Sequence, residues 1–326
     1  MPGRRWQDTA ANHGAGLPDG APARNRAGES LMRVRLAALA LALSLWVSGH
    51  GGPAAFAQQP IEFGDAYTIQ SETLGEARTI NVWVPPHADE DPRAPYRVLY
   101  LIDGGTQQDW FHITGLAQLG ALSWTFEPMV VVGIETDDRQ NELTPQASDE
   151  RYVAEFPTSG DAEAFRAFLT DEVKPFVKAN FPVRDESALI GESLAGLFVA
   201  DTYLTSPDAF DDYLAISPSL WWDDKALGVE AARLMAAHDY EGKRLFIAAA
   251  DEGGTMQDAI DQLYGAAVEA GVEVHFDDLS ATETHATIFH QAALRAFRRL
   301  YAEPPYDYGP TPWYLIEGGE PKPAQD

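Results

Sequence analysis

Hydrophobic and polar positions along the chain follow two strand-like patterns. Residues 61–70 and 78–84 are apolar at every second position, which indicates strands with one buried face. The turn that contains Gly75 joins them, so they are expected to pair as antiparallel strands. Residues 97–102 and 129–134 are almost continuously apolar, as in strands of a parallel sheet that are buried on both faces.

Apolar residues at helical spacing predict helices between most of the strands. The helices are expected at residues 109–122, 161–180, 194–204, 224–238, 256–270 and 288–301, and further strands at 188–191, 213–216, 244–249 and 272–276. Pro175 is expected to kink the second helix because proline has no amide hydrogen. This alternation predicts an α/β fold, with a mainly parallel sheet, helices on both faces and antiparallel first strands. A ligand site is expected at the carboxyl ends of the strands.

The N-terminal part of the chain has the pattern of an export signal. Met32 begins a short basic segment, the apolar run 36–47 follows, and Ala55 and Ala57 supply small residues at the cleavage positions. The run is too short to cross a bilayer as a helix. We therefore predict an upstream extension at residues 1–31, a signal peptide at 32–57 and an exported protein, periplasmic or extracellular, without stable membrane insertion after cleavage.

A single α/β domain is expected over residues 58–302, because no internal repeat or linker divides it and single α/β domains reach about 200 to 250 residues or more. A Pro-rich tail follows at residues 303–326. Residues 137–160 are polar and irregular. They form either a loop over the site or a disordered surface connection.

Composition narrows the possible chemistry. The formal net charge of −27 disfavours nucleic acids and anionic lipid surfaces as partners. The absence of cysteine excludes disulfides, thiolate metal sites and a cysteine nucleophile. The eight histidines form no metal-ligand spacing such as H-E-x-x-H, so neither a metal nor another cofactor is expected.

The strongest local motif surrounds Ser193. The predicted strand at 188–191 runs directly into a helix, and the turn reads G-E-S-L-A over residues 191–195. Small residues two positions to either side of a serine are typical of a sharp turn that exposes a nucleophilic hydroxyl. Ala195 replaces the glycine usual at the second of these positions. The alternative is a serine that only caps the helix.

The order of later polar residues favours the nucleophile. In hydrolases with such a turn, an acid follows the serine and a histidine comes last. Asp251 and Glu252 follow one predicted strand, and His285 follows the next. His285 is the candidate general base and Glu252 the preferred acid, with Asp251 as the alternative. His290 falls inside the last helix and is expected to be a packed or exposed helix residue.

Backbone amides for an oxyanion are expected from two places. Leu194 offers the amide that follows the nucleophile. The loop after the strand at 97–102 reads D-G-G-T over residues 103–106, and the amide of Gly105 or Thr106 is the second candidate. A turn that only connects two elements is an equally good interpretation of this loop.

Together these segments resemble the Putative esterase family of α/β-hydrolases, which includes S-formylglutathione hydrolases, siderophore esterases, carbohydrate esterases and mycolyltransferases. The resemblance extends over residues 61–301 and is closest to the exported siderophore-esterase branch. It is carried by V-L-Y-L-I-D-G at 98–104, G-E-S-L-A-G at 191–196, S-P-S-L-W-W-D at 217–223 and E-T-H at 283–285.

The resemblance implies an α/β-hydrolase fold, a Ser-His pair with a variable acid, and a site lined by residues 217–222. Trp221 and Trp222 are then expected to contact an acyl or aryl group of the substrate, and core packing is the alternative.

The predicted function is hydrolysis of a small-molecule carboxylic ester or thioester through an acyl-enzyme. An acyltransferase, or a non-catalytic binding protein of the same fold, is the alternative. Export disfavours a cytosolic glutathione thioester, and the negative charge disfavours a catecholate ester. Lys225 and Arg151 are the basic residues expected nearest to the site, and the substrate itself stays open.

Overall fold

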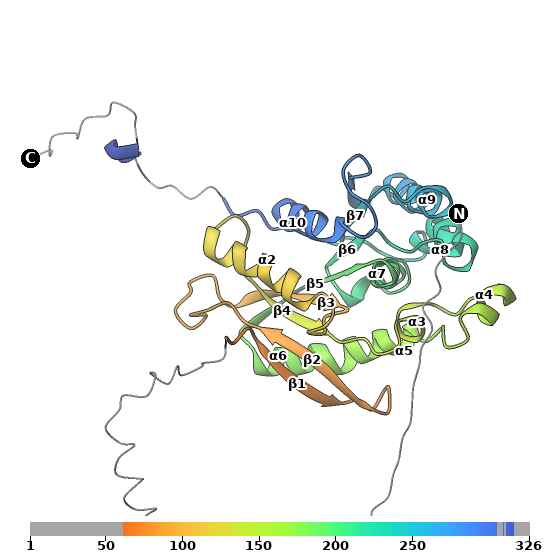
Figure 1. Ribbon diagram of the computed structural model, residues 1–326, viewed down its shortest axis with the longest axis horizontal. Coiled ribbons are helices and arrows are strands. Elements are labelled where there is room, and N and C mark those ends of the chain that lie inside the picture. Colours follow the sequence, from red (N-terminus) through yellow and green to blue (C-terminus); the bar gives the residue numbers. More distant parts are fainter. Residues whose placement is uncertain (1–60, 305–308, 310, 316–326) are drawn as a thin grey trace, which may run out of the picture. The chain divides into compact units, whose positions relative to one another are not determined.

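The computed structural model describes residues 61–304, 309 and 311–315, and the described strands form one sheet in the order β1-β2-β4-β3-β5-β6-β7-β8 (Figure 1). The strands are β1 (Asp65–Gln70), β2 (Ala77–Trp83), β3 (Tyr96–Ile102), β4 (Met129–Ile134), β5 (Val183–Glu192), β6 (Asp212–Ile216), β7 (Arg244–Ala249) and β8 (Glu273–Asp278). Every strand expected from the sequence is present.

The sheet changes direction where the sequence pattern changes. β1 pairs with β2, and β2 with β4, as antiparallel strands, whereas the pairs from β4 through β3 to β8 are parallel. β3, β4 and β6 are buried along their whole length, which explains their continuously apolar sequences. The predicted mixed sheet with antiparallel first strands is therefore confirmed.

Helices cover both faces of the sheet (Figure 1). The longer helices are α2 (Trp110–Ser123), α7 (Leu194–Thr205), α8 (Trp222–Met235), α9 (Gly254–Ala270) and α10 (Ile288–Leu300). Buried residues of α2 and α10 belong to one hydrophobic cluster, and those of α7, α8 and α9 belong to another. The parallel strands lie between these clusters, so their carboxyl ends are left for a site.

The helix expected over residues 161–180 is broken into three pieces. α5 (Ala162–Ala167) passes into the π-helical stretch η2 (Phe168–Val173), and α6 (Lys174–Asn180) begins with Pro175 in its first turn. Proline cannot donate the backbone hydrogen bond of a regular α-helix at this position. The wider π-helical turn directly before the proline accommodates the missing bond.

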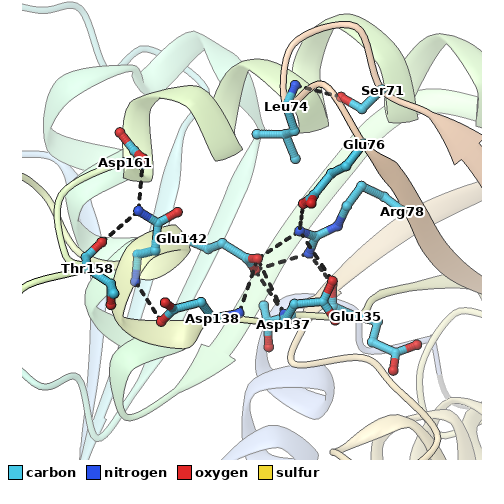
Figure 2. Close-up of polar contacts among 12 residues, drawn as sticks. Ser71, Leu74, Glu76, Arg78, Glu135, Asp137, Asp138, Glu142, Thr158 and Asp161 are labelled. Carbon is cyan, nitrogen blue, oxygen red and sulfur yellow. Dashed lines mark hydrogen bonds and ion pairs between the residues drawn. The ribbon is translucent and has the colours of Figure 1, made fainter.

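The segment 137–160 contains two short helices, α3 (Arg139–Leu143) and α4 (Glu150–Glu155). Figure 2 shows how α3 is attached to the sheet. The buried Arg78 of β2 donates to Glu142 of α3 over 2.7 Å and to the carbonyl of Glu135 over 2.8 Å. Glu76, Asp137 and Glu142 come close together here, and the Arg78 guanidinium supplies the positive charge that they share.

No helix in the described part of the chain is long and apolar enough to cross a membrane. The predicted extension (residues 1–31) and signal peptide (residues 32–57) lie outside the described residues, as does most of the predicted tail. A short turn of 3-10 helix, η4 (Trp313–Leu315), is described within that tail.

Candidate active site

Ser193 stands in a strained turn between β5 and α7. Its backbone has φ 63° and ψ −120°, a region that non-glycine residues rarely adopt. A Cβ atom on Gly191 would lie 2.6 Å from the Cβ of Ala195, so glycine is required there while alanine fits opposite it. A Cβ on Gly196 would lie 2.7 Å from the carbonyl oxygen of Ile216. Close packing on both sides of the turn therefore holds the hydroxyl outward beyond the strand end.

His285 faces Ser193 from the loop between β8 and α10. Its Nε2 atom lies 2.9 Å from Ser193 Oγ. The loop is closed by a small turn in which the Thr287 amide donates to the Thr284 carbonyl over 2.9 Å. The sequence indicated both residues as candidates, and the structure places them within hydrogen-bond distance.

Glu252, rather than Asp251, contacts the imidazole. Glu252 Oε2 lies 3.1 Å from His285 Nδ1, and this carboxylate side chain is only 2% exposed. Asp251 is exposed, and its backbone amide donates to the Glu283 carbonyl over 3.1 Å. Asp251 thus ties the loop after β7 to the loop that carries His285, while its neighbour reaches the ring.

Ser217 and Ser219 complete the surroundings, and neither had been singled out from the sequence as an individual residue. The buried Ser217 Oγ lies 2.7 Å from His285 Nδ1 and donates to Glu252 Oε1. Ser219 Oγ lies 3.3 Å from Ser193 Oγ, and its amide donates to the Ser193 carbonyl over 3.0 Å. Both serines belong to the S-P-S-L-W-W motif at residues 217–222. This motif is the sequence feature from which their place in the site could have been predicted.

These contacts shift the pKa values of Glu252 and His285. Burial alone would raise the pKa of Glu252, but hydrogen bonds from His285 and Ser217 outweigh it and lower that pKa. The hydrogen bond to Glu252 raises the pKa of His285 against the effect of burial, and the nearby negative charge of Glu192 adds to the rise. The carboxylate therefore stabilises the imidazolium form of His285.

The two predicted sources of backbone amides for the oxyanion, Leu194 and the loop at residues 103–106, have different surroundings in the structure. Leu194 is the first residue of α7, where the amide has no intrahelical acceptor and the helix field favours negative charge. The Gly105 amide donates to the side chain of Gln108 over 2.9 Å. The Gly105 amide is therefore engaged in this structure, and Thr106, which is exposed beside it, is the candidate that we retain from that loop.

A cavity of about 400 Å³ opens beside Ser193. It is lined by Asp109, His112, Arg139, Glu192, Ser193, His285, Ala286, Phe289 and His290. Arg139 brings α3 to its edge, so the segment 137–160 contributes to the site instead of being a disordered connection.

His290 stacks edge-on against His112 at 4.3 Å between ring centroids. A larger cavity of about 690 Å³, lined by residues such as His238 and Gly271, does not include Ser193.

The two tryptophans pack against α4. Trp222 is 3% exposed and donates through its indole nitrogen to the Pro145 carbonyl over 3.0 Å. Trp221 stacks on Tyr152 at 6.3 Å between ring centroids, and the Tyr152 hydroxyl donates to the Trp221 carbonyl. Neither tryptophan lines the cavity beside Ser193. Trp222 packs in the core, so the prediction that it contacts the substrate is wrong. Trp221 is partly exposed, and its contact with a substrate stays a prediction.

Known proteins with a similar fold include a serine hydrolase and siderophore hydrolases. The chain resembles the structure of an IroE-like serine hydrolase from Shewanella oneidensis with a TM-score of 0.65 and 22% identity, over 73% of this chain and 80% of that one. The BES protein from Bacillus cereus gives a TM-score of 0.64 and 21% identity, over 75% of this chain and 98% of that one. These likenesses show that the fold is that of the α/β-hydrolases.

Proteins that are similar in sequence include siderophore esterases. The ferri-bacillibactin esterase BesA of Bacillus subtilis is 32% identical over 170 residues, which are 45% of this chain and 56% of the relative. The siderophore triacetylfusarinine C esterase of Aspergillus fumigatus is 28% identical over 188 residues, 53% of this chain and 61% of the relative. The chain therefore spans less than two thirds of the length of these relatives. The profile of the Putative esterase family matches residues 71–286, well over half of the chain, and the chain belongs to that family.

Proposed function

We propose that this protein is an exported serine esterase that hydrolyses a carboxylic ester through an acyl-enzyme. The observation that carries the proposal is the continuous contact from Ser193 Oγ through both nitrogens of His285 to the buried Glu252. This is the arrangement in which a base takes the serine proton while a carboxylate holds the ring and stabilises its charge. Membership of the esterase family supports the same chemistry.

In the proposed acylation, each of these residues has a defined role. His285 Nε2 takes the proton of Ser193 as Oγ bonds to the ester carbonyl carbon. The tetrahedral oxyanion is stabilised by the amides of Leu194 and Thr106 and by the field at the start of α7. When the carbon–oxygen bond to the alcohol breaks, the imidazolium returns its proton to the leaving oxygen. Water then repeats the sequence on the acyl-enzyme and releases the acid, and no cofactor is required.

The relatives supply the substrate class for the proposal. Among them are esterases named for ferri-bacillibactin and for triacetylfusarinine C. We therefore propose an ester bond of a siderophore as the substrate. An exported enzyme would meet such a compound outside the cytosol, which agrees with the signal peptide predicted at residues 32–57.

The test is labelling with a fluorophosphonate probe, followed by mass-spectrometric mapping and assays with short p-nitrophenyl esters. We expect the label on Ser193, and we expect Ser193→Ala to lower kcat by several orders of magnitude, as nucleophile removal does in well-studied serine proteases. Ser123→Ala, an exposed serine at the end of α2, is the matched control and should be labelled and active like the wild type. Equal activity of Ser193→Ala and the wild type would refute the proposal.

A further inference from the structure

Two carboxylates lie on the substrate side of the proposed catalytic pair. Glu192 directly precedes Ser193, and its Oε1 atom lies 3.8 Å from His285 Nε2, the nitrogen that faces the nucleophile. Asp109 lines the same cavity and makes no capping hydrogen bond to α2 with its side chain. Glu252, by contrast, is on the opposite side of the ring at Nδ1. The proposed mechanism uses Glu252 and leaves the other two unexplained.

The positive charge around this cavity is already engaged. Among the residues that line the cavity, Arg139 carries the permanent positive charge. Its Nε atom donates to both oxygens of Asp103, at 3.0 and 2.9 Å, and its Nη2 atom lies 2.8 Å from Asp103. The buried Asp103 thus compensates the guanidinium charge.

The two basic residues expected near the site are also paired elsewhere. Lys225 lies 3.5 Å from Asp258, and Arg151 pairs with Asp149. Neither of them lines the cavity. Once the Arg139–Asp103 pair is counted as neutral, Asp109 and Glu192 give the cavity a net negative charge whenever they are ionised.

The protonation of these groups depends on what faces them. Burial raises the pKa of Glu192 to about 7, the charges of Asp109 and Asp103 act in the same direction, and His285 and Arg139 oppose the rise. Burial and Asp103 raise the pKa of Asp109 to about 6, against His112 and Arg139. Both carboxyls are therefore ionised at pH 8, whereas Glu192 is largely protonated at pH 6. A cation in the cavity would stabilise both ionised forms.

We propose that Glu192, assisted by Asp109, makes this site selective for esters that carry a positively charged group close to the scissile carbonyl and against esters that carry a negatively charged one. The inference rests on the proposed esterase function and specifies its substrate class. For a siderophore ester, it favours a neutral or cationic compound over a multiply anionic complex such as a ferric tris-catecholate. The charge of −27 on the whole chain acts in the same direction.

The test uses three p-nitrophenyl esters of equal acyl length that end in trimethylammonium, tert-butyl or carboxylate. At pH 8 we expect kcat/KM to fall in that order. The ratio of cationic to anionic ester should drop about tenfold in Glu192→Gln and by a smaller factor in Asp109→Asn. It should also shrink when salt is added or when the pH is lowered to 6.

Two further variants separate the alternatives. Glu269→Gln removes an exposed negative charge on α9 that does not line the cavity beside Ser193, and it should leave the ratio unchanged. Arg139→Gln should raise the ratio, because it frees the Asp103 charge. Preference for the anionic ester that disappears in Arg139→Gln would assign specificity to Arg139 and overturn the proposal.

The outcomes also distinguish this proposal from the function on which it rests. An enzyme that is labelled at Ser193 and hydrolyses the tert-butyl ester, but has the same ratio with and without Glu192, retains the esterase function and loses the selectivity. An enzyme that is not labelled and hydrolyses none of the three esters loses both.

Discussion

At the residue scale, His285 is held by two oxygen-bearing side chains on one nitrogen and by the nucleophile on the other. Glu252 lies 3.1 Å and Ser217 2.7 Å from Nδ1. The Ser217 hydroxyl hydrogen goes to Glu252, so its oxygen is free to accept the Nδ1 hydrogen together with the carboxylate. This pattern selects the tautomer in which Nε2 is ready to take a proton from Ser193.

The first prediction concerns the acid. Glu252→Gln should lower kcat by a smaller factor than Ser193→Ala, because the serine, the histidine and the oxyanion donors stay in place. Asp251→Asn should be milder still, since its side chain is exposed and does not contact the ring. Kinetics of both single variants and the double variant, with circular dichroism as a check of folding, measure this. A double variant with wild-type kcat would indicate a Ser-His dyad.

The second prediction concerns pH. His285 is active as a base only when it is neutral, and the contact with Glu252 raises its pKa above the ordinary 6.5. The acidic limb of kcat/KM for the tert-butyl ester should therefore have an apparent pKa above that value, with activity lost as the pH falls through it. Glu252→Gln should move the limb to lower pH, because the stabilisation of the imidazolium is lost. His290→Ala should leave the position of the limb almost unchanged. A limb that does not move in Glu252→Gln would contradict the assignment.

Sequence reasoning at this scale succeeded where a residue is fixed by its place after a strand. Ser193, His285 and Glu252 each follow a strand whose carboxyl end meets the others at one edge of the sheet, and the structure brings them together. Arg139 and Asp109 were missed because their contribution depends on how separate helices turn, which no local pattern records. The engagement of the Gly105 amide by the Gln108 side chain, three residues later, was also not predictable, because it depends on a side-chain conformation.

At the element scale, the attachment of α3 to β2 decides whether Arg139 reaches the cavity. Arg78 on β2 is buried and binds Glu142, which stands three residues after Arg139 and almost one helical turn away (Figure 2). The Asp138 side chain also accepts from the amides of Gln140 and Asn141, which fixes the start of the helix.

The third prediction follows from this attachment. Arg78→Met should destabilise the fold by about 3 to 5 kcal/mol, because it leaves Glu142 buried without its cation. The matched control is Arg151→Met, which breaks an exposed, solvent-screened pair with Asp149 and should leave the unfolding free energy almost unchanged. Urea unfolding followed by circular dichroism measures both. Equal unfolding free energies for the two variants would show that the buried pair does not hold α3.

The elements themselves were predictable wherever periodicity was strong. The extent of β4 was predicted to the residue, and α2, α7 and α10 differ from expectation only at their ends. β5 begins at Val183, well before the apolar run, because Val183 pairs with Tyr96 at the start of β3 and the register then shifts before pairing resumes at Ser187. Pairing with a neighbouring strand is a tertiary effect, so the amino-acid pattern alone placed that boundary too late.

At the scale of the whole molecule, the charge of the surface and the charge of the cavity have the same sign. The net charge of −27 raises the local concentration of cations near the protein, and the carboxylates beside Ser193 then act at short range. At 0.1 M salt, charges that are more than about 10 Å apart are largely screened from each other, so added salt weakens the long-range attraction. Salt should therefore weaken the encounter with a cationic ester more than the chemical step that follows binding.

The last prediction concerns export, which involves the whole chain. Processing of the signal predicted at residues 32–57 should yield a protein that begins at Gln58, because cleavage requires small residues such as Ala55 and Ala57 before the cut. Expression in a Gram-negative host, fractionation and mass determination of the N-terminus measure this. Ala57→Leu should accumulate the unprocessed chain, whereas Ala54→Leu, outside the two small positions, should be cut as before. An unprocessed wild-type chain recovered only from the cytosol would contradict the export on which the proposed encounter with a siderophore depends.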